Sequence, residues 1–219
     1  MPDPTTTYRE ALRFSWLTRH YDRILDWSIN DRQFKDQLIR ESGILPHHRV
    51  LDFGCGTGSL SLQIKSRFPT AEVMGLDVDD RILRLAEAKA RSKKCSVDWY
   101  HGTLADQAAE IGSVDRIVSS LVFHHLTTTE KKEALSQLVS MLAPDGEIHI
   151  ADFGRPRSFL MRVAFLGVRI LDGFDRTEVN ALGQLQDMMA GAGLINVHVS
   201  QCFSTLCGSI ELIHGSKAG

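Results

Sequence analysis

The sequence predicts one α/β domain built on a doubly wound, mostly parallel sheet that closes with an antiparallel strand pair. From Val50 onward, short β-rich runs alternate with amphipathic stretches of helical period, as parallel sheets covered by helices require. The chain has 219 residues, enough for one sizeable α/β domain, and it shows no internal repeat or low-complexity linker. Its content of 43% hydrophobic and 24% charged residues is ordinary for a globular protein.

The core elements follow one another in a regular order. Strands are expected at residues 49–53, 72–77, 96–101, 114–121 and 147–153. Helices with one apolar face are expected at residues 57–67, 79–94 and 128–142. Pro144, Asp145 and Gly146 predict a turn before the fifth strand, because proline fixes φ and glycine tolerates a positive φ.

Two flanking regions interrupt the alternation. The expected organisation is a single domain, 1–219, with an N-terminal helical cap (1–45), the ligand-binding core (46–153), a helical insertion that would roof a substrate (154–193) and closing strands (194–219). The roof candidates are aromatic and aliphatic side chains: Phe14, Trp16, Tyr21, Trp27 and residues 159–166. They favour a largely apolar ligand, although the same residues would also serve simply to pack helices on the sheet.

Composition excludes several classes of protein. No segment reaches the roughly 18 uninterrupted apolar residues of a membrane span, and no secretory signal is visible, so a cytoplasmic location is expected. The formal net charge is −2, and the basic run at residues 89–94 suits a helix end, so no nucleic-acid partner is expected. The four cysteines form no CxxC pair and the histidines lack ligand spacing, so no metal site is expected.

The segment VLDFGCGTG (50–58) places three glycines directly after an apolar run. Glycine permits a positive φ and a close approach of ligand to backbone, so this loop predicts a bound cofactor. A dinucleotide site needs G-x-G-x-x-G, whereas Ser59 stands at the third glycine position here. Asp52, at the strand end, would repel a phosphate and attract a cationic group such as an α-ammonium.

A second acid follows at the distance expected for a nucleoside site. Asp77 closes the next strand in GLDVD, where a carboxylate can accept hydrogen bonds from both ribose hydroxyls. Asp52 and Asp77 together describe a nucleoside that carries an ammonium, which is the structure of S-adenosylmethionine. Taken singly, Asp52 would also suit a turn and Asp77 a helix cap.

These motifs resemble those of class I S-adenosylmethionine-dependent methyltransferases, which have a Rossmann-like fold. VLDFGCGTG, GLDVDD and VDRIVSSLVFHHL are similar to the first, second and fourth motifs of that family, and LAPDGEIHIADFG to the passage into its fifth strand. The resemblance covers residues 45–153 well and the tail more loosely. The chain looks most like the ubiquinone/menaquinone C-methylating subgroup, whose N-terminal helix also carries a Tyr-Asp pair, here Tyr21-Asp22.

The resemblance implies a set of cofactor contacts. The residues that would line the methionine half are Asp52, Gly54, Cys55, Gly56 and Thr57. Tyr21 from the cap would be a further cofactor contact. Asp77 would hold the ribose, with Val78 against the adenine. Thr103 departs from the family's acidic or amide residue, so a hydroxyl or backbone bond to the adenine is expected there, with Leu104 packing and Asp106 as an alternative contact. Ser120 and Leu121 would lie under the sulfonium.

His124 and His125 are the candidate catalytic bases, because histidine titrates near neutrality. The alternative is that the pair only packs the loop that closes the cofactor site. Asp152, at the end of the fifth strand, would serve as a further base or would cap a turn. Methyl transfer from a sulfonium mainly requires alignment of donor and acceptor, so a base is optional.

The resulting prediction is an S-adenosylmethionine-dependent methyltransferase that acts on a small, largely apolar acceptor and releases S-adenosylhomocysteine. Protein or nucleic-acid methylation is disfavoured by the charge balance and by SLVF in place of an Asn-Pro-Pro-Tyr-like tetrapeptide. A non-catalytic cofactor-binding module and a nicotinamide oxidoreductase are further alternatives. The oligomeric state and the atom that is methylated are left open.

Overall fold

The computed structural model describes residues 31–155, 179–180, 182–205 and 208–218. Its centre is a seven-stranded sheet with the order β3-β2-β1-β4-β5-β7-β6. All neighbours pair in parallel except β7, which runs antiparallel to both β5 and β6. The strands are β1 (Arg49–Phe53), β2 (Glu72–Asp77), β3 (Asp98–His101), β4 (Val114–Ser120), β5 (Leu142–Phe153), β6 (Leu194–Thr205) and β7 (Gly208–Lys217). The predicted fold class is confirmed.

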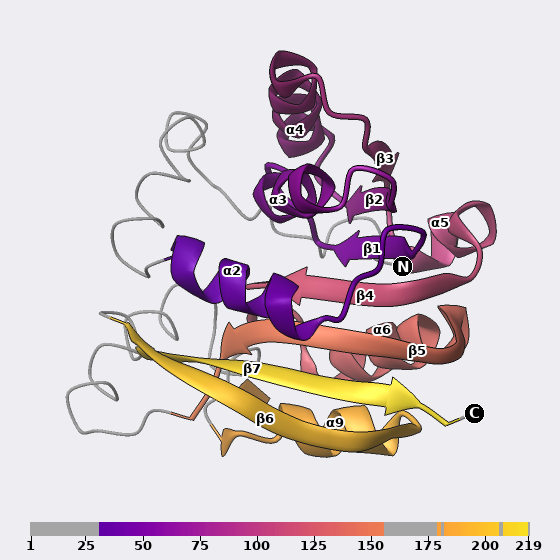
Figure 1. Cartoon of the computed structure of the whole chain (residues 1–219). Coiled ribbons are helices and arrows are strands. Elements are labelled where there is room, and N and C mark those ends of the chain that lie inside the picture. The colour runs from indigo at the N-terminus through magenta and orange to yellow at the C-terminus, as the bar shows by residue number, and fades with distance from the viewer. Residues whose placement is uncertain (1–30, 156–178, 181, 206–207, 219) are drawn as a thin grey trace, which may run out of the picture.

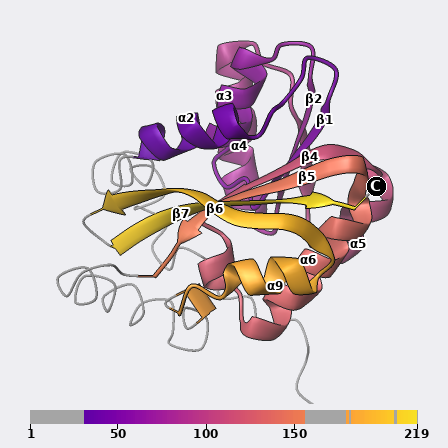
Figure 2. The ribbon, with the colours of Figure 1, turned by 60° about the horizontal axis from the view of Figure 1, so that its bottom comes forward.

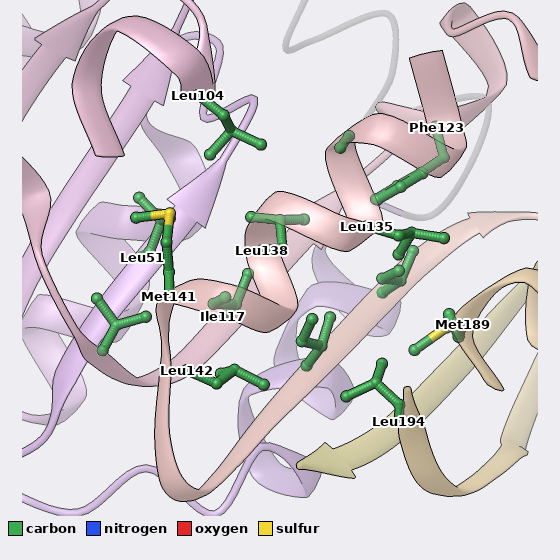
Figure 3. Packing of buried hydrophobic residues seen from close by; sticks show 14 of the residues in the cluster. Leu51, Leu104, Ile117, Phe123, Leu135, Leu138, Met141, Leu142, Met189 and Leu194 are labelled. Atoms are coloured by element: carbon green, nitrogen blue, oxygen red, sulfur yellow. The ribbon is translucent and has the colours of Figure 1, made fainter. Parts of the chain in front are cut away.

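Helices cover both faces of this sheet (Figure 2). They are α2 (Asp31–Glu41), α3 (Ser59–Arg67), α4 (Asp80–Lys93), α5 (Leu104–Ile111), α6 (Thr128–Met141) and α9 (Leu185–Gly191). One core cluster joins the sheet to α5, α6 and α9, and Figure 3 shows Leu135 and Leu138 of α6 packed in it with Ile117 of β4. The other core cluster joins the opposite face to α2, α3 and α4.

The arrangement brings the carboxyl ends of the five neighbouring parallel strands, β3, β2, β1, β4 and β5, to one edge of the sheet. β2 and β4 lie on opposite sides of β1, so the connection that follows β1 and the one that follows β4 diverge there (Figure 1). Ligands of open α/β sheets bind at such a switch point, outside the carboxyl ends of the strands. The fold therefore places the site at the carboxyl ends of β1, β2 and β4.

The predicted turn at residues 144–146 was wrong. Residues 144–146 do not form a separate turn: β5 begins at Leu142, which pairs with Val114, and the ladder shifts register before Arg116 pairs with Glu147. Asp145 takes a positive φ of 61° inside this irregular stretch. The proline and glycine thus mark a bulge within a strand, because pairing with β4 resumes on both sides of them.

Helix α5 (Leu104–Ile111) was not predicted. It starts with a capping box, in which the Thr103 hydroxyl accepts from the Asp106 N–H and the Asp106 carboxylate accepts from the Thr103 N–H. The sequence signal Thr-x-x-Asp was present, but the segment was interpreted as a ligand loop.

The flanks are described only in part. Helix α2 confirms a helix in the second half of the cap, while Tyr21, the other cap aromatics and the roof candidates at 159–166 lie outside the described residues. The division of the chain into cap, core, roof and closing strands stays a prediction. Among the residues that the structure describes, no helix has the length and apolar character needed to cross a bilayer.

Candidate cofactor and active site

The glycine loop after β1 is fastened to β2. The backbone N–H groups of Gly54 and Cys55 both donate to the Leu76 carbonyl, at 2.9 and 3.0 Å. Gly54, Gly56 and Gly58 have φ values of 70°, 52° and 74°, which disfavour residues with a Cβ. The loop is therefore a rigid connection whose shape depends on all three glycines.

The three glycines are required for different reasons. A Cβ on Gly54 would lie 2.4 Å from the Val122 side chain, and one on Gly58 would lie 2.5 Å from the Trp99 ring. A Cβ on Gly56 would meet no described atom within 4 Å. Packing within the protein thus accounts for Gly54 and Gly58, and only Gly56 offers open space to a ligand.

We expect Gly58→Ala to be clearly more damaging than Gly56→Ala. Both substitutions force a residue with a Cβ into the left-handed region, which costs about 1–2 kcal/mol. Gly58→Ala adds a clash with Trp99 and Ala86. The expected loss in the free energy of unfolding therefore rises to roughly 3 kcal/mol or more. Urea unfolding of the two unliganded variants measures the difference, and equal losses would contradict this account of the loop.

Asp52, at the end of β1, is buried and does not lie open to solvent. Its side chain is only 1% exposed, and it accepts a 2.5 Å hydrogen bond from the Ser61 hydroxyl at the start of α3. Burial raises the pKa of Asp52 to about 6, in spite of the Ser61 hydrogen bond and the positive charge of Lys35. The predicted attraction of an ammonium by Asp52 must therefore act from a buried position.

Asp77 fixes the loop to the end of β2. Its Oδ2 accepts from the Gly56 N–H at 2.8 Å, and its Oδ1 accepts from the Asp79 N–H at 2.9 Å. Burial raises the pKa of Asp77 above its ordinary value. Asp79, not Asp77, is the N-cap of α4, so the helix-cap alternative for Asp77 is wrong. Each carboxylate oxygen keeps a second lone pair with which to accept from a ribose hydroxyl.

Of the residues predicted to contact the adenine, Val78 is the one whose side chain is exposed and available to a ligand. It follows Asp77 directly and is 37% exposed, so its side chain offers an apolar surface to a ligand beside Asp77. Thr103 and Asp106 are occupied with each other, since the Thr103 hydroxyl donates to the Asp106 carboxylate at 2.7 Å. Leu104 is 5% exposed and packs in the core cluster beneath α5. The structure thus gives Thr103, Leu104 and Asp106 partners inside the protein.

The end of β4 carries an unsatisfied polar atom. Ser119 donates to the Phe53 carbonyl at 2.9 Å, whereas the buried hydroxyl of Ser120 has no hydrogen-bond partner among the described residues. Leu121 follows with a φ of 60°, a strained value for a leucine. Both features lie at the switch point, where a ligand would contact the Ser120 hydroxyl.

A buried carboxylate holds the loop that follows Leu121. Oδ2 of Asp152 accepts from the N–H groups of Val122, Phe123 and His124 at 3.0, 2.7 and 3.4 Å, and Oδ1 lies 2.8 Å from Nδ1 of His124. Burial raises the pKa of Asp152, but the charge and hydrogen bond of His124 outweigh it, so the pKa lies below its ordinary value. Asp152 is therefore a positioning residue for this loop and not a base.

The two histidines differ in their surroundings. His124 is 4% exposed, its ring is bound to Asp152, and it packs edge-on against Phe153. His125 is half-buried, and its ring centroid lies 3.9 Å from that of His124. The structure therefore supports the packing alternative for His124 and leaves His125 as the more accessible candidate base. In the described part of the chain, no three metal-ligating side chains gather at binding distance.

Three residues of the site were not foreseen from the sequence. Ser61 binds Asp52, Lys35 of α2 acts electrostatically on Asp52, and the Asn180 amide donates to the Phe153 carbonyl at 2.9 Å and to Asp152 at 3.3 Å. Asp31 and Lys35 are spaced for an i,i+4 ion pair, which was the one available signal. Ser61 and Asn180 have no local signal, because their partners come from other elements.

The residues present fit S-adenosylmethionine. Gly56 offers open space beside the Asp77 carboxylate, Val78 exposes an apolar surface next to it, and the Ser120 hydroxyl is buried without a partner. These features surround the carboxyl ends of β1, β2 and β4, as a nucleoside bound at the switch point requires.

Comparison with known proteins leads to the same class. Residues 50–146 match the family described as a methyltransferase domain. An uncharacterized methyltransferase of Bacillus licheniformis is 35% identical over 150 residues, which cover 68% of this chain and 61% of that protein. The demethylmenaquinone methyltransferase of Deinococcus radiodurans is 26% identical over 155 residues, which cover 69% and 63%. The chain thus spans about three fifths of the length of these curated relatives.

The fold has well-matched neighbours among solved structures. Magnesium protoporphyrin IX methyltransferase of Synechocystis PCC 6803, solved with bound S-adenosylhomocysteine, superposes with a TM-score of 0.71 at 19% identity and covers 93% of this chain and 95% of its own. Fold, motifs and relatives agree: residues 50–146 match a methyltransferase domain, and the sheet has the Rossmann-like fold of solved S-adenosylmethionine-dependent methyltransferases. The predicted resemblance to the ubiquinone/menaquinone subgroup is confirmed by relatives that carry those names.

Proposed function

We propose that the chain transfers a methyl group from S-adenosylmethionine to a small, largely apolar acceptor. The observation that carries this proposal is the meeting of three features at one switch point: the rigid glycine loop, the Asp77 carboxylate bound to Gly56, and the unsatisfied Ser120 hydroxyl. When bound, the cofactor supplies a methyl group on a positively charged sulfur, which is already activated for transfer.

Each residue would then have a distinct task. Asp77 accepts hydrogen bonds from the ribose hydroxyls with the lone pairs that Gly56 and Asp79 leave free. Val78 covers one face of the adenine. Asp52 attracts the α-ammonium from its buried position, and Ser120 lies nearest to the sulfur. Cys55 and Thr57, 8% and 7% exposed, would contribute mainly backbone contacts. A contact from Tyr21 stays a prediction.

The acceptor is proposed from two lines of support. Relatives of this chain are named demethylmenaquinone and 2-phytyl-1,4-naphtoquinone methyltransferases, and a structural neighbour is a porphyrin methyltransferase, all of which act on small molecules with large apolar parts. The formal net charge of −2 gives no support to a nucleic-acid acceptor. A cytoplasmic location stays a prediction.

The loop after β4 would place the base, where one is needed. Asp152 fixes His124, and the tilted packing of the two rings orients His125. We propose that His125 takes the proton from a weakly acidic acceptor, while His124 acts through the loop. A non-catalytic binding module would retain cofactor binding without turnover, so a release of S-adenosylhomocysteine that depends on an added acceptor separates the two functions.

Asp77→Ala is expected to abolish stabilisation by the cofactor. A ligand that binds only the native state raises the free energy of unfolding, and with it the melting temperature. At a ligand concentration 100 times its Kd the added free energy is about 2.7 kcal/mol. We expect S-adenosylmethionine and S-adenosylhomocysteine to stabilise the natural chain in a thermal shift experiment and NAD to leave it unchanged. Because Asp77 also binds the loop, the Asp77→Ala shift is referred to that variant's own unliganded melting temperature.

The matched control is Asp98→Asn, which changes an exposed carboxylate on β3 and should leave the shift intact. Stabilisation by NAD alone would refute the proposed function. An undiminished shift in Asp77→Ala would refute the role given to Asp77.

A further inference from the structure

Asn180 carries a buried polar atom that the hydrogen bonds around Asp152 do not use. The residue precedes α9 and is 1% exposed. Its Nδ2 donates to the Phe153 carbonyl at 2.9 Å and to Oδ1 of Asp152 at 3.3 Å. Its Oδ1 is buried and has no hydrogen-bond partner among the described residues. A buried acceptor without a donor is costly, so this oxygen calls for an explanation.

The neighbours of Asn180 fix the orientation of its amide. A backbone carbonyl and an ionised carboxylate can only accept hydrogen bonds, so the amide nitrogen must face Phe153 and Asp152. A flipped amide would place its oxygen against these two oxygens instead. The backbone is held as well, because the Asn180 carbonyl accepts from the Gly183 N–H at 3.1 Å. The unpaired oxygen is therefore held in one direction before any ligand arrives.

The position of Asn180 connects it with the proposed reaction. Its amide shares Oδ1 of Asp152 with Nδ1 of His124, and the His124 ring centroid lies 3.9 Å from that of His125. Ser120, which is proposed to lie nearest to the sulfur, ends β4, and β4 pairs with β5 up to the residue before Asp152. Asn180 thus lies at the end of the next strand along the sheet, beside the loop that carries the candidate base.

We propose that Asn180 is a specificity residue that accepts a hydrogen bond from an O–H or N–H group of the methyl acceptor. This inference rests on the proposed function, because it concerns the same site. An apolar site orients its ligand with a few fixed polar groups. A ligand of the same shape without a donor would leave the Asn180 oxygen unpaired, and sites of this kind reject such analogues strongly. The acceptor is thus an apolar molecule that bears a hydrogen-bond donor.

The alternative is that Asn180 only ties Asp152 to the end of β5. A tie of that kind affects every ligand of the site, whereas a hydrogen bond to the acceptor affects only ligands that carry a donor. Three probes of similar size test this difference: 1-naphthol carries an O–H group, 1-naphthylamine an amino group, and 1-fluoronaphthalene no donor. The ring system is chosen because a relative of this chain is named 2-phytyl-1,4-naphtoquinone methyltransferase.

The experiment is equilibrium dialysis of each probe against the chain saturated with S-adenosylhomocysteine. A hydrogen bond to a buried acceptor corresponds to about a tenfold change in affinity. We expect Asn180→Leu, which has a similar volume and no polar side-chain atom, to weaken 1-naphthol or 1-naphthylamine by that factor. The same variant should bind 1-fluoronaphthalene and S-adenosylhomocysteine within about twofold of the natural chain. The probe that loses more affinity distinguishes an O–H from an N–H acceptor.

Two further measurements keep the test decisive. Gln63→Leu is the matched control, since the Oε1 of Gln63 is another buried amide oxygen without a partner in the described part of the chain, but it lies on α3, which packs on β2. It should change none of the probe affinities. The natural chain alone must bind at least one donor probe more tightly than 1-fluoronaphthalene, although 1-fluoronaphthalene is the most apolar of the three, and this comparison does not depend on the folding of a variant.

Equal losses for all three probes in Asn180→Leu, or no loss for any, would overturn the role of Asn180 alone. So would a natural chain that binds S-adenosylhomocysteine but prefers 1-fluoronaphthalene or binds none of the probes. Failure of the natural chain to bind S-adenosylhomocysteine would overturn the proposed function and this inference with it.

Discussion

Asp52→Asn is expected to stabilise the unliganded chain near pH 7.5. Burial raises the pKa of Asp52 to about 6, whereas an unfolded aspartate has a pKa of about 3.9. Between these two values the folded state holds a proton that the unfolded state has lost. A rise in pH through this window therefore lowers the free energy of unfolding, and the full loss is present above about pH 6. Asparagine does not ionise and so avoids this loss. The free energy of unfolding of the variant should therefore exceed that of the natural chain by roughly 2–3 kcal/mol.

The same substitution should weaken cofactor binding, with a characteristic pH dependence. The ammonium of S-adenosylhomocysteine is attracted by ionised Asp52, so the affinity of the natural chain should rise as the pH increases through about 6. The affinity of Asp52→Asn should be lower by about tenfold near pH 7.5 and flat across that range. A buried charge would thus be retained at the expense of stability because it serves binding.

Urea unfolding near pH 4.5 and pH 7.5, together with calorimetric titration at several pH values, measures both effects. The stability difference between the variant and the natural chain should be small at the lower pH and large at the higher one. Asp98→Asn, which changes an exposed carboxylate, should shift neither measurement. A variant that is less stable than the natural chain at both pH values would show that Asp52 contributes through its hydrogen bond to Ser61 instead.

Local patterns in the sequence were sufficient to predict most of the fold. The predicted second strand, residues 72–77, coincides with β2, and the helix at 79–94 differs from α4 only by its two capping residues, Asp79 and Lys94. Such elements can be predicted because the hydrophobic periodicity and the cap residues that define them lie within one segment of sequence. The start of β5 was predicted less well, since its first pairing, between Leu142 and Val114, depends on a strand elsewhere in the chain.

The candidate site was predictable to the extent that its chemistry lies in short motifs. The glycine loop and Asp77 were found because three glycines and an acid at a strand end have few other uses. What the sequence does not show is which partner each group meets. Asp52 proved to be buried against Ser61, and Thr103 proved to cap a helix. Lys35 lies in a helix outside the core motifs, and only the folded chain brings its charge to Asp52.

The strained loop after β4 shows how the structure supports the site. Leu121 has a positive φ, and its N–H donates to the Ala151 carbonyl at 2.8 Å. The next three N–H groups all donate to Asp152. Backbone strain of this kind persists only where surrounding interactions fix it. Asp152 supplies them from the neighbouring strand, so β5 determines the course of the loop that carries both histidines.

Asp152→Ala is therefore expected to be among the most destabilising substitutions in the described part of the chain. It would leave the N–H groups of Val122, Phe123 and His124 and the His124 ring without their acceptor. Removal of one partner from such a largely buried charged network lowers the free energy of unfolding by roughly 3–5 kcal/mol. Asp152→Asn keeps the volume and one acceptor oxygen, so it should lose less, about 2 kcal/mol. Urea unfolding near neutral pH measures both losses.

The charge of His124 and its hydrogen bond hold the pKa of Asp152 below its ordinary value, so the stabilising contribution of its charge is present above about pH 4 and is lost as the pH falls further. Asp152→Asn should still bind S-adenosylhomocysteine, because Asp77 and the glycine loop are untouched, yet its turnover should fall as the histidine loop loses its fixed position. If Asp152→Asn kept both full stability and full turnover, the carboxylate would have no part in positioning that loop.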